Sequence, residues 1–257
     1  MGNIDQRWQP KLPPGGCDPP TDSFNTTHWS VVLMAGQESS PEASAALERL
    51  CHTYWYPLYA YCRRQGHAPP DGEDLTQQFF AVFLEKKSFN LADPDRGRFR
   101  NFLLASFRHF LANEHHRNRT AKRGGRFAFV SWDDADLETQ YRNEPSDGFT
   151  AEKLFDQTWA FTLLGKVMKD LRAEHVGAGK EQLFDALEVF LTGEKAEATY
   201  EQIGADLQMS ESAVKMAVSR LRQRYGQLLR REVAHTVTNP AWVEDELRHL
   251  VQVLTAR

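Results

Sequence analysis

Apolar residues recur at helical spacing along most of this chain, and the pattern predicts an all-α fold. Three apolar stripes precede residue 120. The first consists of Leu47, Leu50, Tyr54, Leu58 and Tyr61. The second consists of Leu75, Phe79, Val82 and Phe83, and the third of Phe99, Leu103, Phe107, Phe110 and Leu111. We expect Pro57 to kink or divide the first helix, and Pro69-Pro70-Asp71-Gly72 to separate it from the second.

Helical periodicity is lost after residue 120 and returns near Ala151. The next helix is marked by Phe155, Trp159, Leu163, Leu164, Val167, Met168 and Leu171. Another is marked by Leu183, Phe184, Leu187 and Phe190, and a last one by Val243, Leu247, Leu250, Val251 and Leu254. No strand pattern and no repeat interrupts this order, so we expect helices alone.

The breaks in the pattern predict two small helical domains joined by a flexible acidic linker. Residues 1–25 are rich in Pro and Gly and are expected to be a disordered tail. The predicted domains are residues 26–120 and 151–238, with the linker at 121–150. Residues 239–257 are expected to form a C-terminal helical extension.

The composition of the chain predicts where in the cell the protein is found. The 257-residue chain is 41% hydrophobic and 26% charged, and no apolar run approaches the roughly 18 residues of a membrane span. Its first residues lack the apolar core of a signal peptide, so we expect a cytoplasmic protein without a membrane partner. Cys17, Cys51 and Cys62 lack metal-type spacing, and the latter two are expected to be buried, reduced thiols. The sequence predicts no cofactor, no metal and no catalytic residue.

Charge is strongly segregated along the chain. Residues 95–126 hold nine Arg and Lys against two acidic residues, a net charge of +7, whereas residues 131–152 have a net charge of −6. Residues 212–231 hold six basic residues and no acid. A single block of this kind is usually a solvated helix face. Three alternating blocks indicate two surfaces that bind a polyanion, joined by a tether.

The segment from Thr199 to Tyr225 predicts a helix-turn-helix. Thr199 and Gln202 form a capping box that begins a short helix, and Ser210 caps the next helix. The inward positions are Ile203, Leu207, Val214, Val218 and Leu221. The outer face of the second helix carries Ser212, Lys215, Met216, Ser219, Arg220 and Arg222. A small, basic outer face of this kind suits a recognition helix in the major groove, although a plain helical hairpin gives the same pattern.

Two motifs resemble those of bacterial RNA polymerase sigma factors of the extracytoplasmic-function type. The helix-turn-helix is similar to their region 4, with Gln208 where Gly is typical of the turn. The run Glu73-Asp74-Leu75-Thr76-Gln77-Gln78-Phe79-Phe80 is similar to their region 2 signature, and Phe99-Arg100-Asn101-Phe102-Leu103 to the start of their promoter-melting helix. The resemblance covers roughly residues 26–254. Residues 122–125 and the tail after Val237 resemble a subgroup with a C-terminal extension.

The resemblance implies three binding surfaces. The recognition helix would read the −35 element through the six outer residues named above. Contacts to core RNA polymerase, at the β′ clamp helices, would come from Asp74, Gln77, Gln78 and Phe80, and the β flap is a further expected partner. Contacts to the −10 element would come from Arg96, Arg98, Arg100, Arg108, His109, Asn113, His116, Arg117 and Arg119. The family pattern has Asn at position 109 and Asp at 113, so the −10 preference of this chain stays open.

The resemblance therefore implies a sigma factor that binds core polymerase and promoter DNA, and not an enzyme. A stand-alone helix-turn-helix regulator of duplex DNA is the main alternative, and an RNA-binding adaptor is the third. The sequence leaves open whether an anti-sigma protein, a kinase or the C-terminal tail restrains activity.

Overall fold

The computed structural model describes residues 41–85, 98–118, 137–144, 148–192, 199–237 and 239–255. These residues form helices and short connections, with no strand among them, which confirms the all-α prediction. The elements in the first half are α2 (Pro41–Arg64), α3 (Pro69–Glu85), α4 (Phe99–Asn118) and α5 (Leu137–Arg142). Those in the second half are α6 (Ala151–Gly177), α7 (Glu181–Leu187), α8 (Val189–Thr192), α9 (Tyr200–Asp206), α10 (Glu211–Thr236), η3 (Pro240–Trp242) and α11 (Val243–Thr255).

Neither of the two expected helix breaks is found at its predicted position. α2 runs through Pro57 without being divided, because the surrounding turns are held by buried side chains such as Tyr54 and Leu58. Pro69-Pro70-Asp71-Gly72 is the first turn of α3, where a proline lacks no helical hydrogen bond. The single helix predicted around Leu183 to Phe190 is two short helices that separate at Glu188.

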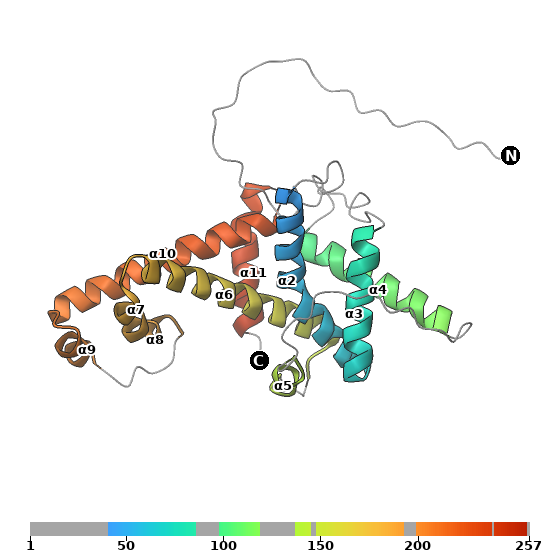
Figure 1. Ribbon diagram of the computed structural model, residues 1–257, viewed down its shortest axis with the longest axis horizontal. Helices are drawn as coiled ribbons and strands as arrows, with labels where there is room; N and C mark the ends of the chain where they lie inside the picture. Colours follow the sequence, from blue (N-terminus) through green and yellow to red (C-terminus); the bar gives the residue numbers. More distant parts are fainter. Residues whose placement is uncertain are drawn as a thin grey trace, which may run out of the picture.

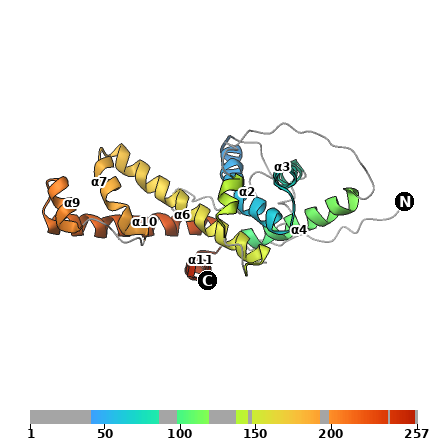
Figure 2. The same cartoon turned by 90° about the horizontal axis from the view of Figure 1, so that it is seen from below.

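The molecule is elongated, and its two longest helices, α6 and α10, pack against each other at an angle (Figures 1 and 2). α6 has 27 residues and α10 has 26, so each is about 40 Å long at 1.5 Å per residue. Thr150 caps the start of α6, where its side chain accepts a hydrogen bond from the Lys153 amide. These two helices are the frame on which the other elements pack.

One apolar core joins elements that the sequence assigned to separate domains. Buried side chains of α2, α3 and α4 pack together with the first half of α6, and with Val233 of α10 and Leu250 of α11. The most extensive helix contact is between α2 and α6. Trp159 of α6 is fully buried at this junction. In this structure the first half of α6 therefore completes the core of the preceding helices.

A second core lies at the other end of the frame. It is built from the second half of α6, from α7, from α9 and from α10, and its fully buried members include Val167, Leu171, Phe184 and Val214. Phe190 of α8 stacks on Tyr200 of α9 with ring centroids 4.9 Å apart, which closes its edge. This core holds the helix-turn-helix in place.

The acidic segment between the halves is partly helical. α5 lies inside residues 121–150, the predicted linker, and it packs on α2. Tyr59 donates a hydrogen bond to Glu138 over 3.0 Å, Tyr56 donates one to Glu144 over 2.8 Å, and Arg63 pairs with Glu138. The flexible tether predicted from composition is thus a docked segment at residues 137–144, because α2 offers phenol and guanidinium donors to its carboxylates. The predicted tail at 1–25 lies outside the described residues.

Candidate nucleic-acid interface

The helix-turn-helix is formed by α9, α10 and the turn between them. Thr199 and Gln202 form the predicted capping box, and the Ser210 hydroxyl accepts a hydrogen bond from the Ala213 amide. Ile203, Val214 and Val218 are buried in the core beneath. The two predicted helix starts and the inward face are confirmed.

The turn between the helices depends on two residues with unusual requirements. Gln208 has a φ of 55°, the left-handed conformation that a helix-turn-helix usually assigns to Gly. Gly204 lies against the turn: a Cβ at this position would come within 2.6 Å of the Met209 carbonyl oxygen. The absence of a side chain at Gly204 therefore lets the turn backbone pass directly over α9.

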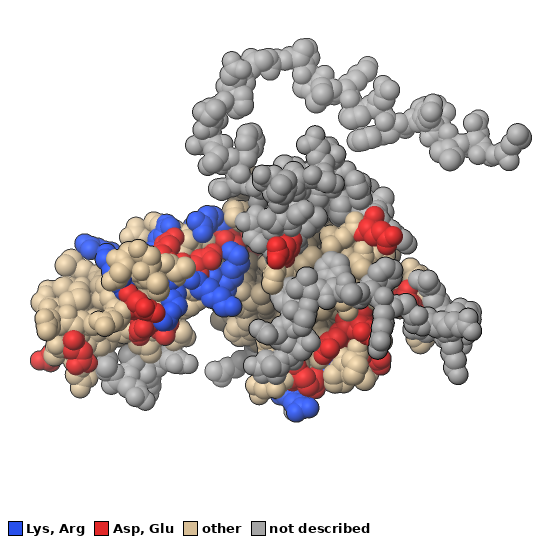
Figure 3. Space-filling view, viewed as in Figure 1, with Lys and Arg blue, Asp and Glu red and all other residues tan. Residues whose placement is uncertain are grey.

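The outer face of α10 is exposed at all six predicted positions: Ser212, Lys215, Met216, Ser219, Arg220 and Arg222. Figure 3 shows Lys and Arg side chains gathered over the stretch where α6 and α10 run together, with acidic residues among them. Gln223 is also exposed and lies eleven residues after Ser212, which places it on the same face. Its helical phase is the signal by which the sequence could have included it.

The basic residues of this face differ in how they are held. Lys215 pairs with Glu211 over 2.7 Å, and its pKa is raised by the hydrogen bond to that carboxylate. Arg222 donates two hydrogen bonds to the Phe190 carbonyl oxygen, at 3.3 and 3.1 Å, so it fastens α8 to α10. Within the described part of the chain, Arg220 has no such partner. Arg220 is therefore the guanidinium best placed to meet a phosphate or a base edge.

Other charged side chains of α10 pair with neighbouring helices. Arg224 donates to both carboxylate oxygens of Glu174 on α6, at 2.7 and 2.6 Å, and these hydrogen bonds lower the pKa of Glu174. Arg230 pairs with Glu244 of α11. The basic block of residues 212–231 is thus divided between side chains on the exposed outer face and side chains in ion pairs between helices.

α4 presents a second exposed stripe. Its exposed positions within the described side chains follow helical spacing: Asn101, Ala105, Arg108, His109, Ala112, Asn113 and His115. Arg108, His109 and Asn113 were predicted for this surface, and Arg108 has a carboxylate of Glu152 at 3.8 Å. Asn101 was missed, although it has the same helical phase.

The remaining predicted residues of the −10 surface have different positions. Arg96 and Arg119 lie outside the described residues, and the side chains of His116 and Arg117 lie outside them too. Arg100 is only 3% exposed and lies 4.7 Å from the centre of the Trp159 ring. Its Nε is 3.2 Å from an Asp156 carboxylate oxygen. In this arrangement Arg100 is a buried, fully engaged group and not an accessible DNA contact.

α3 carries the predicted surface for core polymerase. Asp74 and Gln78 are exposed and Gln77 is half-buried, so the polar members of the set share an accessible face. Phe80 differs from the prediction, because it is 3% exposed and stacks on Trp55 with ring centroids 5.7 Å apart. Phe80 is a core residue in this structure, as are Phe79 and Phe83.

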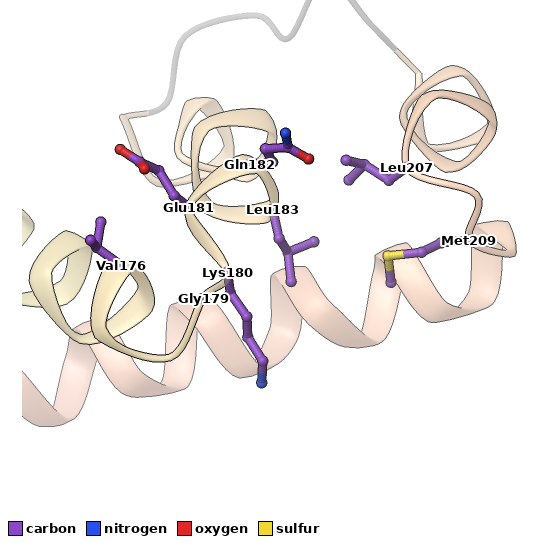
Figure 4. A pocket seen from close by; sticks show the side chains of 8 residues that line it. All are labelled: Val176, Gly179, Lys180, Glu181, Gln182, Leu183, Leu207 and Met209. Carbon is purple, nitrogen blue, oxygen red and sulfur yellow. The ribbon is translucent and has the colours of Figure 1, made fainter.

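A shallow hollow of about 540 Å³ lies beside the helix-turn-helix (Figure 4). It is lined by Val176, Gly179, Lys180, Glu181, Gln182, Leu183, Leu207 and Met209. Leu207 and Met209 of the turn face Leu183 of α7 across it (Figure 4). The lining combines aliphatic side chains with one Lys and one Glu. Such a lining suits contact with another protein surface better than it suits catalysis.

The cysteines and the possible metal ligands are the remaining side chains with reactive chemistry. Cys62 is fully buried and Cys51 half-buried, both are free thiols, and burial raises the pKa of each to about 12. Cys17 lies outside the described residues. The described residues hold no group of three or more His, Cys, Asp or Glu that could hold a metal ion. None of the helices in the described ranges is long and apolar enough to cross a membrane.

Comparison with protein-family models, with curated proteins and with solved structures finds no match to this chain.

Proposed function

We propose that this protein is a sigma factor that binds bacterial core RNA polymerase in the cytosol and directs it to promoters. The observation that carries the proposal is the recognition helix. Six side chains chosen from sequence lie exposed along α10, over a buried Val214, Val218 and Leu221. Such a face can reach base edges while its basic residues bind phosphates.

The two ends of the molecule receive different roles in this proposal. The helix-turn-helix would read the −35 element, with Lys215 and Arg220 on phosphates or guanine edges and the 55%-exposed Met216 against a thymine methyl group. The α4 stripe of Arg108, His109 and Asn113 would face the −10 element. This division rests on the resemblance of both motifs to sigma-factor regions and on the exposure of both stripes.

The third role falls to α3. Its exposed Asp74 and Gln78 offer directed polar contacts, and the aromatic residues behind them hold the helix rigid. A rigid polar face of this kind suits a protein interface, here with the β′ clamp helices of core polymerase. A stand-alone regulator of duplex DNA would use the recognition helix alone and would leave this face without a partner.

The test is binding of the purified chain to bacterial core RNA polymerase, followed by run-off transcription on genomic promoter fragments. Lys215→Ala combined with Arg220→Ala is expected to abolish −35-dependent transcripts, because two cationic contacts are lost, while binding to core polymerase stays unchanged. Lys169→Ala with Lys180→Ala is the matched control, since it removes two exposed positive charges outside the recognition face.

Loss of core binding in the Lys215/Arg220 variant would contradict this assignment of roles. Failure of the wild-type chain to bind core polymerase, together with specific binding to duplex DNA, would replace the sigma-factor proposal with the stand-alone regulator.

A further inference from the structure

A single carboxylate from the C-terminal helix holds two arginines at the start of α4. Glu246 of α11 is fully buried. One of its oxygens lies 2.6 Å from Arg98 Nε, and the other accepts from Arg100 Nη1. Residues almost 150 positions apart in the sequence are thereby joined in one ionic cluster, which Asp156 of α6 extends through Arg100.

α11 lies where the two halves of the molecule meet. It packs on both α6 and α10, beside the junction with α2 (Figures 1 and 2). Leu250 is 2% exposed in the shared core, whereas the neighbouring Val251 is 57% exposed. Arg230 of α10 adds an exposed ion pair to Glu244. The helix therefore has one apolar and acidic face against the protein and one face in solvent.

The chemistry of the cluster resembles that of a phosphate contact. A carboxylate and a phosphate both present paired anionic oxygens to a guanidinium, with charge-assisted hydrogen bonds to the same N–H donors. Arg98 directly precedes α4 and Arg100 lies in its first turn, at the start of the helix proposed to meet the −10 DNA. While Glu246 holds Arg98 Nε and Arg100 Nη1, these two donors are withheld from a nucleic-acid backbone.

A purely structural role explains this cluster poorly. Burying ionic groups carries a desolvation cost that apolar residues of similar size avoid, so an ion pair inside a core is weak support for stability. α11 is moreover the last described helix, linked to α10 only through residues 237–242. No described helix follows α11, so its displacement would leave the covalent connections of the other described helices as they are.

We propose that α11 is an autoinhibitory latch that occupies Arg98 and Arg100 and must be released before α4 engages promoter DNA. This inference rests on the proposed function. Of the three restraints that the sequence leaves open, this proposal selects the C-terminal tail of the chain itself.

The test compares two pairs of full-length variants. Glu246→Gln removes the buried carboxylate, and Asp245→Asn makes the same charge change at an exposed site whose partner, Arg248, lies on the same helix. Leu250→Asp undocks the apolar face, and Val251→Asp places the same charge on the solvent face. Circular dichroism establishes that each variant is folded, and hydrogen exchange of the α11 amides measures latch opening.

Binding is measured without polymerase, by fluorescence anisotropy of a short labelled single-stranded DNA over about 50 to 200 mM NaCl. Glu246→Gln and Leu250→Asp are expected to exchange faster in α11 and to bind DNA more tightly. Their log–log salt slope should steepen by about 0.7 for each arginine that reaches a phosphate, about 1.4 in all. Leu250→Asp is decisive, because its added negative charge alone would weaken binding. Adding Arg98→Ala and Arg100→Ala to Glu246→Gln should restore the wild-type slope.

Faster α11 exchange with an unchanged affinity and salt slope would overturn the latch, as would equal behaviour of a variant and its control. If Glu246→Gln does not fold, the comparison of Leu250→Asp with Val251→Asp alone tests the latch. The failure of the proposed function gives a different pattern, since a chain that never binds core polymerase can still show the latch effect on DNA.

Discussion

Gln208 occupies a backbone conformation that side chains disfavour. Its φ of 55° costs a non-glycine residue roughly 1–2 kcal/mol, and the side chain is exposed, so no burial offsets this cost. The sequence identified the position from the usual helix-turn-helix pattern, because the turn type requires a left-handed residue there. The structure confirms this requirement.

Gln208→Gly is therefore expected to stabilise the protein by about 0.5–1 kcal/mol, the relief of strain being partly offset by the greater freedom of glycine in the unfolded chain. Urea denaturation measures the change. Gln223→Gly, the same substitution inside α10, should lower the free energy of unfolding by about 1 kcal/mol. A loss of stability in Gln208→Gly would contradict the strain argument.

Arg100 illustrates what a sequence cannot disclose at this scale. An arginine in a basic helix next to a family motif is a sound candidate for a DNA contact. Its partners, Glu246 and Asp156, lie on helices far along the chain, and no local pattern links them to it. Phe80 was likewise predicted to be accessible and is buried. Helical phase alone does not say which of the three neighbouring phenylalanines faces the core.

At the scale of elements, local signals are the ones that the structure bears out. Thr199 and Ser210 both accept the expected capping hydrogen bonds, because a cap is decided by residues within one turn. Pro57 is expected to kink or divide its helix, and α2 is not divided there. The cost of a proline inside a helix is offset there by the burial of α2 against α3 and α6, which the sequence does not display.

The close packing of α9 on its turn gives a prediction at this scale. Gly204→Ala would place a methyl group 2.6 Å from the Met209 carbonyl oxygen, and backbone cannot yield as a flexible side chain can. We expect a loss of about 1–3 kcal/mol in the free energy of unfolding. Thermal or chemical denaturation of the purified variant provides the measurement.

Gly226→Ala is the control for that change. Gly226 lies in α10 and a Cβ there meets nothing within 4 Å, so helix propensity alone should stabilise the variant by about 1 kcal/mol. Opposite signs for the two glycines would support the packing argument. A stable Gly204→Ala variant would show that the turn shifts.

At the scale of the whole molecule, the apolar stripes established the helices but not their partners. Phe155, Trp159 and Val167 belong to one stripe of α6, yet the first two pack in the core shared with α2 and the third in the core of the helix-turn-helix. A stripe records which face is buried and nothing about which element covers it. For the same reason composition predicted a loose tether where α5 docks on α2.

Because α6 and α10 pass through both cores, we expect the two cores to unfold together. Phe107→Leu in the first core and Phe184→Leu in the second each remove packing at a fully buried site, for a cost of about 1 kcal/mol. Hydrogen exchange of the slowest amides should accelerate in α4 and in α9 for either variant. Acceleration confined to the mutated core would indicate two independent units.

The continuity of α10 has a mechanical consequence. The helix runs without interruption from Ser212 on the recognition face to Val233 at the junction with α11, 21 residues or about 30 Å away. A tilt of such a helix by about 10° about its α11 end would move the proposed recognition face by about 5 Å, more than the roughly 3.4 Å that separates successive bases along a strand. A small angular adjustment where the helices meet is thus enough to change the register in which the far end meets its target.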